Sequence, residues 1–220
     1  MTTLTMDFVE TTATLPRGTR LIAEDVSWAE YEELLTALND QPHYRISYDR
    51  GELEIMSTSA KHESWKVLFT HLLAVLAEEL NLNLYSLGSM TFNLPAFAQG
   101  VEPDDCFYIH RADQVMGLDE LDLTVDPGPE LVVEIDLSSS SLDKFPIYAN
   151  LGVEEVWRRN KRALEFYRCV GGTFQRVERS VLFPLITPAN LEPFLDKGKR
   201  SGIVPMLQAF RAWVRVQQPT

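Results

Sequence analysis

The stretch Leu131-Val-Val-Glu-Ile-Asp-Leu137 decides the fold. It is short, apolar and β-branched, a pattern typical of a strand buried at the centre of a sheet. Glu134 and Asp136 interrupt it at alternate positions, so both carboxylates point to one face of the strand while Ile135 points to the other. Because an unpaired carboxylate is costly to bury, Glu134 predicts a cation close to it.

A helix is predicted directly after this strand, over about residues 142–150. Proline is tolerated only near the first turn of a helix, so Pro146 prevents the helix from beginning much earlier. Ser141 is the expected N-cap, and Gly152 is the expected stop. Lys144 then lies in the first turn and faces back toward the end of the strand.

The rest of the chain predicts a strand-rich α/β or α+β fold in a single domain over residues 1–220, because no repeat or low-complexity linker divides it. Helices are expected over 27–38, 61–80 and 204–216. Strands are expected over 44–48, 52–56, 84–87, 91–94, 104–110, 154–159 and 163–170, followed by another strand after Gly171-Gly172. The remaining predictions are a partly ordered N-terminal arm over 1–20, a loop over 111–129 and a flexible tail over 216–220.

The composition excludes several classes of protein. With 45% hydrophobic and 24% charged residues, the 220-residue chain is neither disordered throughout, nor collagen-like, nor a coiled coil. Its two cysteines, Cys106 and Cys169, are too few for a disulfide framework or a structural zinc site, so a reducing, cytoplasmic environment is expected. No apolar run approaches the roughly 18–20 residues of a membrane span. The N-terminus also lacks the basic and apolar regions of a signal peptide.

Charge is distributed unevenly along the chain. The formal net charge is −12, which argues against a passive nucleic-acid coat because phosphate contacts need cations. Residues 1–143 carry 7 basic and 26 acidic side chains, whereas residues 144–220 carry 13 and 6. Two interpretations stay open for the basic C-terminal third: it meets a partner that carries phosphates, or its charges simply solvate a surface.

Acidic residues also gather in the segment Glu102-Pro-Asp-Asp105. Asp104 stands at the start of a predicted strand, and if that strand pairs with residues 131–137, its carboxylate converges with Glu134. Carboxylate oxygens are hard ligands that suit a magnesium ion that keeps several waters. The alternative is that Asp104 is an ordinary turn residue after a proline.

These residues carry a resemblance. Pro103-Asp104, followed 30 residues later by Glu134-Ile135-Asp136, resembles the PD-(D/E)XK motif of the restriction-endonuclease-like superfamily. Other stretches, in the same order, resemble the Uma-two family of restriction endonucleases within it, over about residues 20–190. They are Tyr48-Asp-Arg-Gly51, Leu53-Glu-Ile-Met56, His62, Leu87-Gly-Ser89, Glu102-Pro-Asp-Asp105, Val132-Val-Glu134, Leu142-Asp-Lys144 and Gly152-Val-Glu-Glu-Val-Trp157.

The resemblance implies a fold and an activity. The expected fold is a restriction-endonuclease-like core, with a central mixed β-sheet flanked by helices and with an additional N-terminal helix and β-hairpin. The implied activity is magnesium-dependent hydrolysis of DNA phosphodiesters, with manganese as a substitute. A symmetric homodimer is also expected, because superfamily members cut duplex DNA as dimers. The helix around Phe210 and Trp213 then packs either on the core or on a partner.

The resemblance also assigns roles. Asp104 and Glu134 would be metal ligands, and the backbone carbonyl of Ile135 would be a third. The chain departs from the motif at Asp136, which stands where the motif has its lysine. Lys144, from the neighbouring helix, is the candidate replacement and completes the expected catalytic set of Asp104, Glu134 and Lys144.

Alternatives stay open for the accessory residues. Asp136 is either a third carboxylate of the site or a brace for the backbone of residues 138–141. His62 either faces the metal pocket or caps its helix, and Glu54 faces either the site or solvent. The basic cluster over 158–162 is either a solvated turn or a DNA contact. The rival function is a catalytically silent nuclease fold that acts as a regulatory or nucleic-acid- or protein-binding module.

Overall fold

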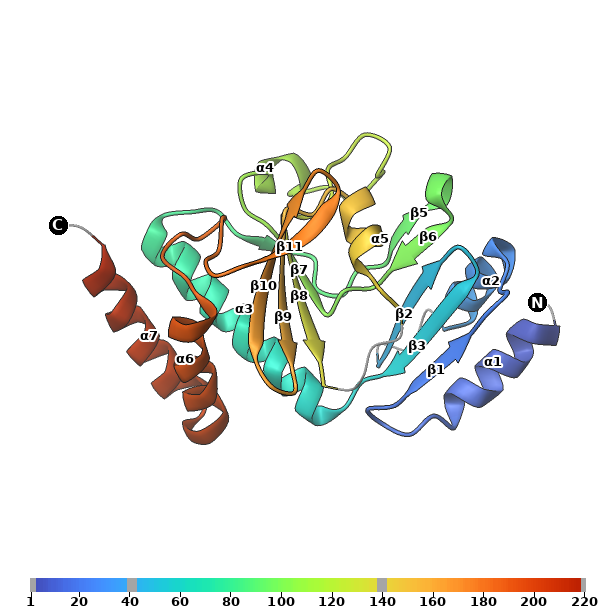
Figure 1. Ribbon diagram of the computed structural model, residues 1–220, viewed down its shortest axis with the longest axis horizontal. Helices are drawn as coiled ribbons and strands as arrows, with labels where there is room; N and C mark the ends of the chain where they lie inside the picture. Colours follow the sequence, from blue (N-terminus) through green and yellow to red (C-terminus); the bar gives the residue numbers. More distant parts are fainter. Residues whose placement is uncertain (1–2, 39–42, 138–141, 219–220) are drawn as a thin grey trace.

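The computed structural model describes residues 3–38, 43–137 and 142–218, and within them the strands form two adjoining sheets (Figure 1). The first, called the mixed sheet, has the order β11-β10-β9-β8-β7-β4. It is mixed because β8 and β9 run parallel while the other neighbours are antiparallel. Its strands are β4 (Tyr85–Ser86), β7 (Asp105–Tyr108), β8 (Leu131–Asp136), β9 (Glu155–Asn160), β10 (Leu164–Val170) and β11 (Thr173–Val177).

The second sheet is antiparallel throughout and has the order β1-β3-β2-β6-β5. Its strands are β1 (Arg20–Ala23), β2 (Tyr44–Asp49), β3 (Glu52–Ser57), β5 (Phe92–Leu94) and β6 (Gln99–Val101). Strands β2 and β3 form the predicted hairpin, which turns at Arg50 and Gly51 with φ values of 48° and 106°. The additional hairpin is therefore part of a complete second sheet.

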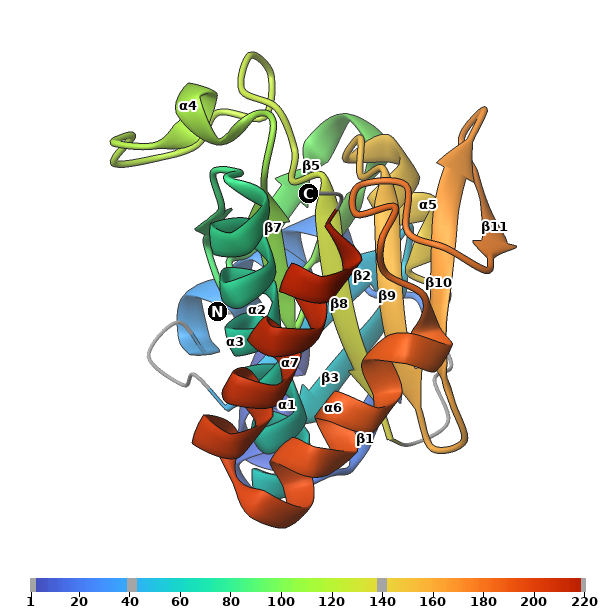
Figure 2. The same ribbon diagram turned by 90° about the vertical axis from the view of Figure 1, so that its left-hand side faces the viewer.

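Helices cover both faces of the mixed sheet. Figure 2 shows α3 (Ala60–Leu80), α6 (Pro188–Ser201) and α7 (Ile203–Gln217) together on one face. Helix α5 (Phe145–Asn150) lies on the opposite face, toward the second sheet (Figure 1). The remaining helices are α1 (Thr3–Ala13), α2 (Trp28–Leu38), α4 (Ala112–Val115) and the short 3₁₀ helix η1 (Pro95–Phe97). The expected mixed sheet flanked by helices, with an added N-terminal helix and hairpin, is confirmed.

Strand β8 is the centre of this arrangement, as the sequence predicts. Leu131, Val133 and Ile135 are fully buried and pack in the cluster that includes the leucine stripe of α3. Val132 packs on the other side, among residues of α5. Because side chains alternate along a strand, Glu134 and Asp136 share the α5 side with Val132.

Several boundaries differ from the predictions. Helix α1 occupies part of the predicted N-terminal arm, and α4 lies inside the predicted 111–129 loop. Helix α5 begins at Phe145, so Lys144 stands at the N-cap position and precedes the first turn. Ser141, the expected cap, lies outside the described residues. Helix α7 continues to Gln217, into the predicted tail.

Helix α6 is missing from the sequence-based prediction because Pro193 and Gly198 lie inside it and break the pattern. Thr187 begins the helix with a capping box formed with Asn190, which offsets the unfavourable residues. Gly198 allows close packing, since a Cβ added there would lie 2.7 Å from Leu68 Cδ2 on α3 and 2.6 Å from Met206 Sδ on α7, and both side chains would have to move. Every helix in the described ranges falls short of the length and hydrophobicity that a membrane crossing requires.

Candidate active site

Asp104 lies where the chain passes from one sheet to the other. Strand β6 of the second sheet ends at Val101, and β7 of the mixed sheet begins at Asp105. Strand β7 pairs with β8 in antiparallel register, so Asp104 lies beside the carboxyl end of β8. The backbone N–H of Ile135 donates to Asp104 Oδ2 at 2.6 Å. The predicted convergence of Asp104 with the Glu134 strand therefore follows from strand pairing.

Asp104 is completely buried and has one satisfied and one unsatisfied oxygen. Oδ2 contacts His62 Nε2 at 3.0 Å in addition to the Ile135 N–H. Oδ1 has no hydrogen-bond partner among the described residues and lies 4.0 Å from Arg45 Nε. Burial alone would raise the pKa of Asp104, but the hydrogen bond and charge of His62, with Lys144 nearby, hold that pKa below its ordinary value. Asp104 is therefore an ionised carboxylate inside the protein.

Ser59, and not His62, caps helix α3, and the His62 side chain is buried. The backbone N–H of His62 bonds the N-cap Ser59 at the start of α3, while its ring faces Asp104. Nδ1 lies 3.4 Å from Glu63 Oε1, so the ring is held between two carboxylates. Burial lowers the pKa of His62, but Asp104 and Glu63 outweigh it and raise the pKa to about 9. His62 is consequently an imidazolium at neutral pH.

Glu134 is held by two residues of the segment after β8. Lys144 Nζ lies 3.1 Å from Glu134 Oε2, and the Tyr148 hydroxyl donates to Oε1. Burial raises the pKa of Glu134, although Lys144 opposes the shift. Burial lowers the pKa of Lys144, but Glu134, Asp104 and Glu54 outweigh it and raise that pKa. Lys144 is therefore the cation that the buried Glu134 predicted.

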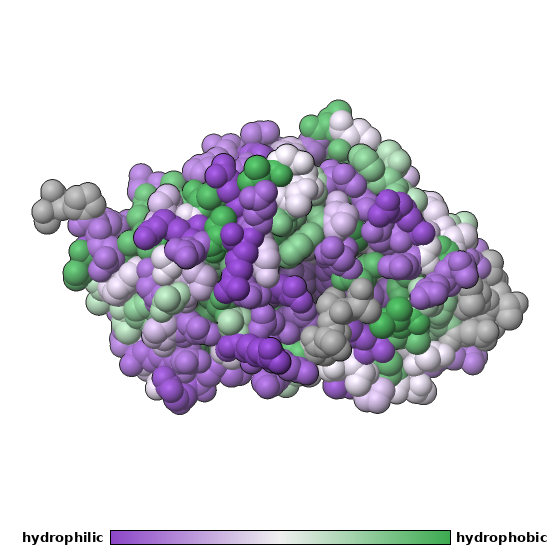
Figure 3. Space-filling model, viewed as in Figure 1, coloured by the Kyte–Doolittle hydropathy of each residue, from purple (hydrophilic) through white to green (hydrophobic). Residues whose placement is uncertain are grey.

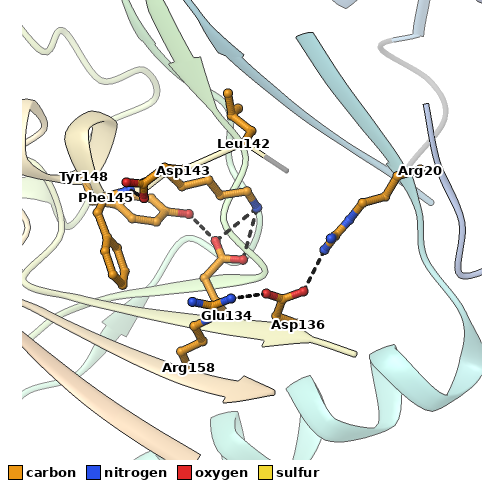
Figure 4. Close-up of a pocket in the computed structure, with 9 residues that line it drawn as sticks. Arg20, Glu134, Asp136, Leu142, Asp143, Phe145, Tyr148 and Arg158 are labelled. Carbon is orange, nitrogen blue, oxygen red and sulfur yellow. Dashed lines mark hydrogen bonds and ion pairs between the residues drawn. The ribbon is translucent and has the colours of Figure 1, made fainter. Parts of the chain in front are cut away.

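A pocket of about 340 Å³ opens beside Glu134. Figure 3 shows a hollow with hydrophilic walls in the middle of the face drawn, below α5. Figure 4 shows the side chains that line the pocket, which come from β1, β8, β9 and the segment around α5. They are Arg20, Glu134, Asp136, Leu142, Asp143, Lys144, Phe145, Tyr148 and Arg158.

Asp136 also lines this pocket, and two arginines of the pocket bind it. Arg20 donates to its Oδ1 at 3.0 Å and Arg158 to its Oδ2 at 2.5 Å. Asp136 thus has two arginine partners instead of joining Asp104 as a free third carboxylate. The expected brace to residues 138–141 lies outside the described residues.

Glu54 lies on β3 and is 2% exposed, so it does not face solvent. It lies 3.5 Å from Arg20 Nε and contributes to the raised pKa of Lys144. The second sheet therefore places a carboxylate at the edge of the site. Of the two alternatives for Glu54, the structure favours the one in which it faces the site over the one in which it faces solvent.

The family model described as "Putative restriction endonuclease", Uma2, matches residues 28–196. The chain belongs to the Uma2 family. The resemblance found in the sequence, to the Uma-two family, is confirmed over most of the chain. Among solved structures, this Uma2 member is similar to the crystal structure of a "putative nuclease belonging to DUF820" from Anabaena variabilis. That similarity has 12% identity and a TM-score of 0.48, and it covers 77% of this chain and 99% of the other. None of the curated proteins compared with it matches.

The residues of this Uma2 member fit a divalent metal ion that takes only a few of its ligands from the protein. The described residues contain no group of three or more His, Cys, Asp or Glu side chains placed to hold a metal. Asp104 and Glu134 lie close enough for their charges to interact, and within the described part of the chain Asp104 Oδ1 is a buried acceptor without a hydrogen-bond donor. The Ile135 carbonyl points to the same side of β8 as its N–H, which meets Asp104. Two carboxylates and one carbonyl suit magnesium, which keeps several of its waters.

Three residues of the site escaped the sequence analysis. Tyr148 has a recognisable signal, because it stands four residues after Lys144, on the same face of the segment that forms α5. Arg45 is a charged residue in an otherwise buried strand of the hairpin, which is the same signal that singled out Glu134. Arg20 has no such signal, because β1 is only four residues long and lies in a segment that resembles an arm.

Proposed function

We propose that this Uma2 member is a metal-dependent endonuclease that hydrolyses phosphodiester bonds of DNA. Family membership supports a nuclease. The observation that carries the proposal is the meeting of Asp104 with the Glu134–Lys144 pair at the junction of β7 and β8. Asp104, Glu134 and the Ile135 carbonyl would hold the ion. A bound magnesium ion would polarise the phosphate and lower the pKa of a water molecule.

The chain's own residues divide the remaining work. Lys144 places a positive charge beside Glu134, where it would stabilise negative charge that develops on a phosphoryl oxygen. Tyr148 donates to Glu134 and fixes the orientation of its carboxylate. His62 holds Asp104 Oδ2 and leaves Oδ1 pointing away from that hydrogen bond. None of these three functions requires a side chain at the position of Asp136.

Incubation with supercoiled plasmid tests the proposal directly. The purified protein would be incubated with magnesium, with manganese or with chelator, beside Glu134→Gln, which keeps the side-chain volume but removes the charge. We expect nicking or linearisation with either metal, and none with chelator or with the variant. Intact plasmid in every reaction, together with retained DNA binding, would favour the rival function of a silent binding module.

Metal binding makes a separate prediction. A ligand that binds only the native state stabilises it by RT ln(1 + [L]/Kd), about 1.4 kcal/mol at ten times Kd. For a domain of this size the gain raises Tm by about 3–6 °C. Thermal unfolding in magnesium and in manganese measures the shift. Asp104→Asn and Glu134→Gln should lose it, and an equal shift in these variants would place the ion elsewhere.

The homodimer and the DNA partner are also part of the proposal. Phe210 and Trp213 pack on the core, which is the first of the two alternatives, because Phe210 is buried and stacks with Trp213, and both rings contact Phe194 of α6. We therefore propose that a dimer uses another surface. Light scattering at micromolar concentration, with and without a duplex oligonucleotide, distinguishes a dimer from a monomer.

A further inference from the structure

A bridge of three charged residues lies in the same pocket and takes no part in the chemistry described above. Asp136 accepts a hydrogen bond from Arg20 on one oxygen and from Arg158 on the other, at 3.0 and 2.5 Å. Figure 4 shows Asp136 between the two arginines. Arg20 belongs to β1 of the second sheet and Arg158 to β9 of the mixed sheet. This Arg20–Asp136–Arg158 bridge therefore joins the two sheets at the wall of the pocket.

The chemistry of the bridge matches that of a bound phosphate. Guanidinium groups bind the paired oxygens of carboxylates and phosphates in the same way, and a phosphodiester offers two such oxygens. Arg158 is 33% exposed, so a ligand entering the pocket reaches it first. Glu54, 3.5 Å from Arg20 Nε, would keep Arg20 in place when Asp136 leaves.

The position of the bridge relative to Glu134 supports the same ligand. Glu134 and Asp136 are two residues apart on one face of β8, so they lie roughly 6.6 Å apart along the strand. Neighbouring phosphates of an extended nucleic-acid strand have a separation on this scale. A strand whose scissile phosphate lies at Glu134 and Lys144 would therefore bring its next phosphate to the bridge.

We propose that Arg158 and Arg20 bind the phosphodiester adjacent to the scissile one, and that Asp136 occupies their guanidinium groups until a nucleic-acid strand displaces it. The inference rests on the proposed function and adds to it a second phosphate position. Arg20 lies before residue 28, outside the region that the family model matches, whereas Arg158 lies inside it. Arg159, the next residue on β9, faces the other way and pairs with Glu192, so it does not contribute.

The test measures binding without cleavage. Fluorescence anisotropy would follow a labelled 12-nucleotide oligothymidylate in chelator, between 50 and 200 mM KCl. The proteins are the wild type, Arg158→Gln, Arg158→Lys, Asp136→Asn and the control Arg176→Gln, whose arginine is exposed, pairs with Glu165 and does not line the pocket. Thermal unfolding of each variant confirms that it is folded.

The salt dependence is the readout that a purely structural arginine would not change. Each lost phosphate contact lowers the slope of log K against log salt by about 0.7 for a single strand. We expect that decrease in Arg158→Gln. Arg158→Lys and Arg176→Gln should keep the wild-type slope. Asp136→Asn should bind the oligonucleotide about 5–20-fold more tightly than the wild type does. A wild-type slope in folded Arg158→Gln, or unchanged affinity in folded Asp136→Asn, would overturn the second phosphate position alone. Failure of the wild type to bind at any salt concentration would also overturn the second phosphate position, whereas the proposed function itself is overturned only by failure of the wild type to cleave plasmid with either metal.

Discussion

Lys144→Met is expected to reduce plasmid cleavage by about 10²–10³-fold or more, through kcat rather than KM. The lysine is buried and paired with Glu134, so its removal takes away the cation that the proposed function places beside the reacting phosphate. Lysine has no oxygen or free lone pair to offer a metal while it is protonated. Magnesium binding should therefore persist in the variant, and the loss of a nearby positive charge should if anything strengthen it.

Two measurements check this prediction together. Cleavage is followed on supercoiled plasmid, and magnesium binding is followed by the shift in Tm. Lys197→Met, on the outer helix α6, is the matched control and should cleave as the wild type does. Wild-type cleavage by Lys144→Met would show that the lysine of this site lies elsewhere and that the carboxylate pair acts without it.

Stability should fall as pH rises through the range in which His62 loses its proton. The pKa of His62 is about 9 in the folded protein against its ordinary value of 6.5, so between these values the folded state holds a proton that the unfolded state has released. The stabilisation is complete below pH 6.5 and is lost as pH approaches and passes 9. A pKa shift of this size corresponds to about 3 kcal/mol in the free energy of unfolding.

Urea unfolding in chelator from pH 6 to pH 9.5 measures this loss. His62→Gln removes the titrating group, so its free energy of unfolding should change much less over the same range. The control is His71→Gln, an exposed histidine on the same helix, which should follow the wild type. If His62→Gln loses stability with pH as steeply as the wild type does, the imidazolium between Asp104 and Glu63 is not the group responsible.

The residues that the sequence placed correctly are those whose signals are local. Glu134 stood out because a carboxylate interrupts an apolar strand, and Lys144 was placed near the start of the next helix by the proline two residues after it. The leucine stripe of α3 and the β2–β3 hairpin likewise follow from spacing and turn residues within one segment. In each case the interaction that decides the structure lies within about ten residues.

Arg20, helix α6 and part of the second sheet escaped prediction because they depend on distant partners. The contact of Asp136 with Arg20 spans 116 positions in the sequence, and no local pattern of either residue indicates the other. Helix α6 is a similar case, because Gly198 weakens the helix locally but permits its contact with α3. Of the second sheet, the sequence predicted the hairpin and the strand over 91–94 but not β1 and β6, which are short and gain their place through pairing with β3 and β2.

The distance in sequence between the parts of the site has a consequence for how the chain folds. The contact between Lys144 and Glu134 spans 10 positions, and that between His62 and Asp104 spans 42. Closing a longer loop costs more entropy, so the Glu134–Lys144 contact is the least costly to form and the Arg20 contact the most costly. During synthesis, β1 leaves the ribosome long before β8 exists to receive it. The contact of Arg20 with the wall of the pocket is thus completed late. A chain interrupted before β8 contains β1 but lacks Asp136, the carboxylate that Arg20 binds.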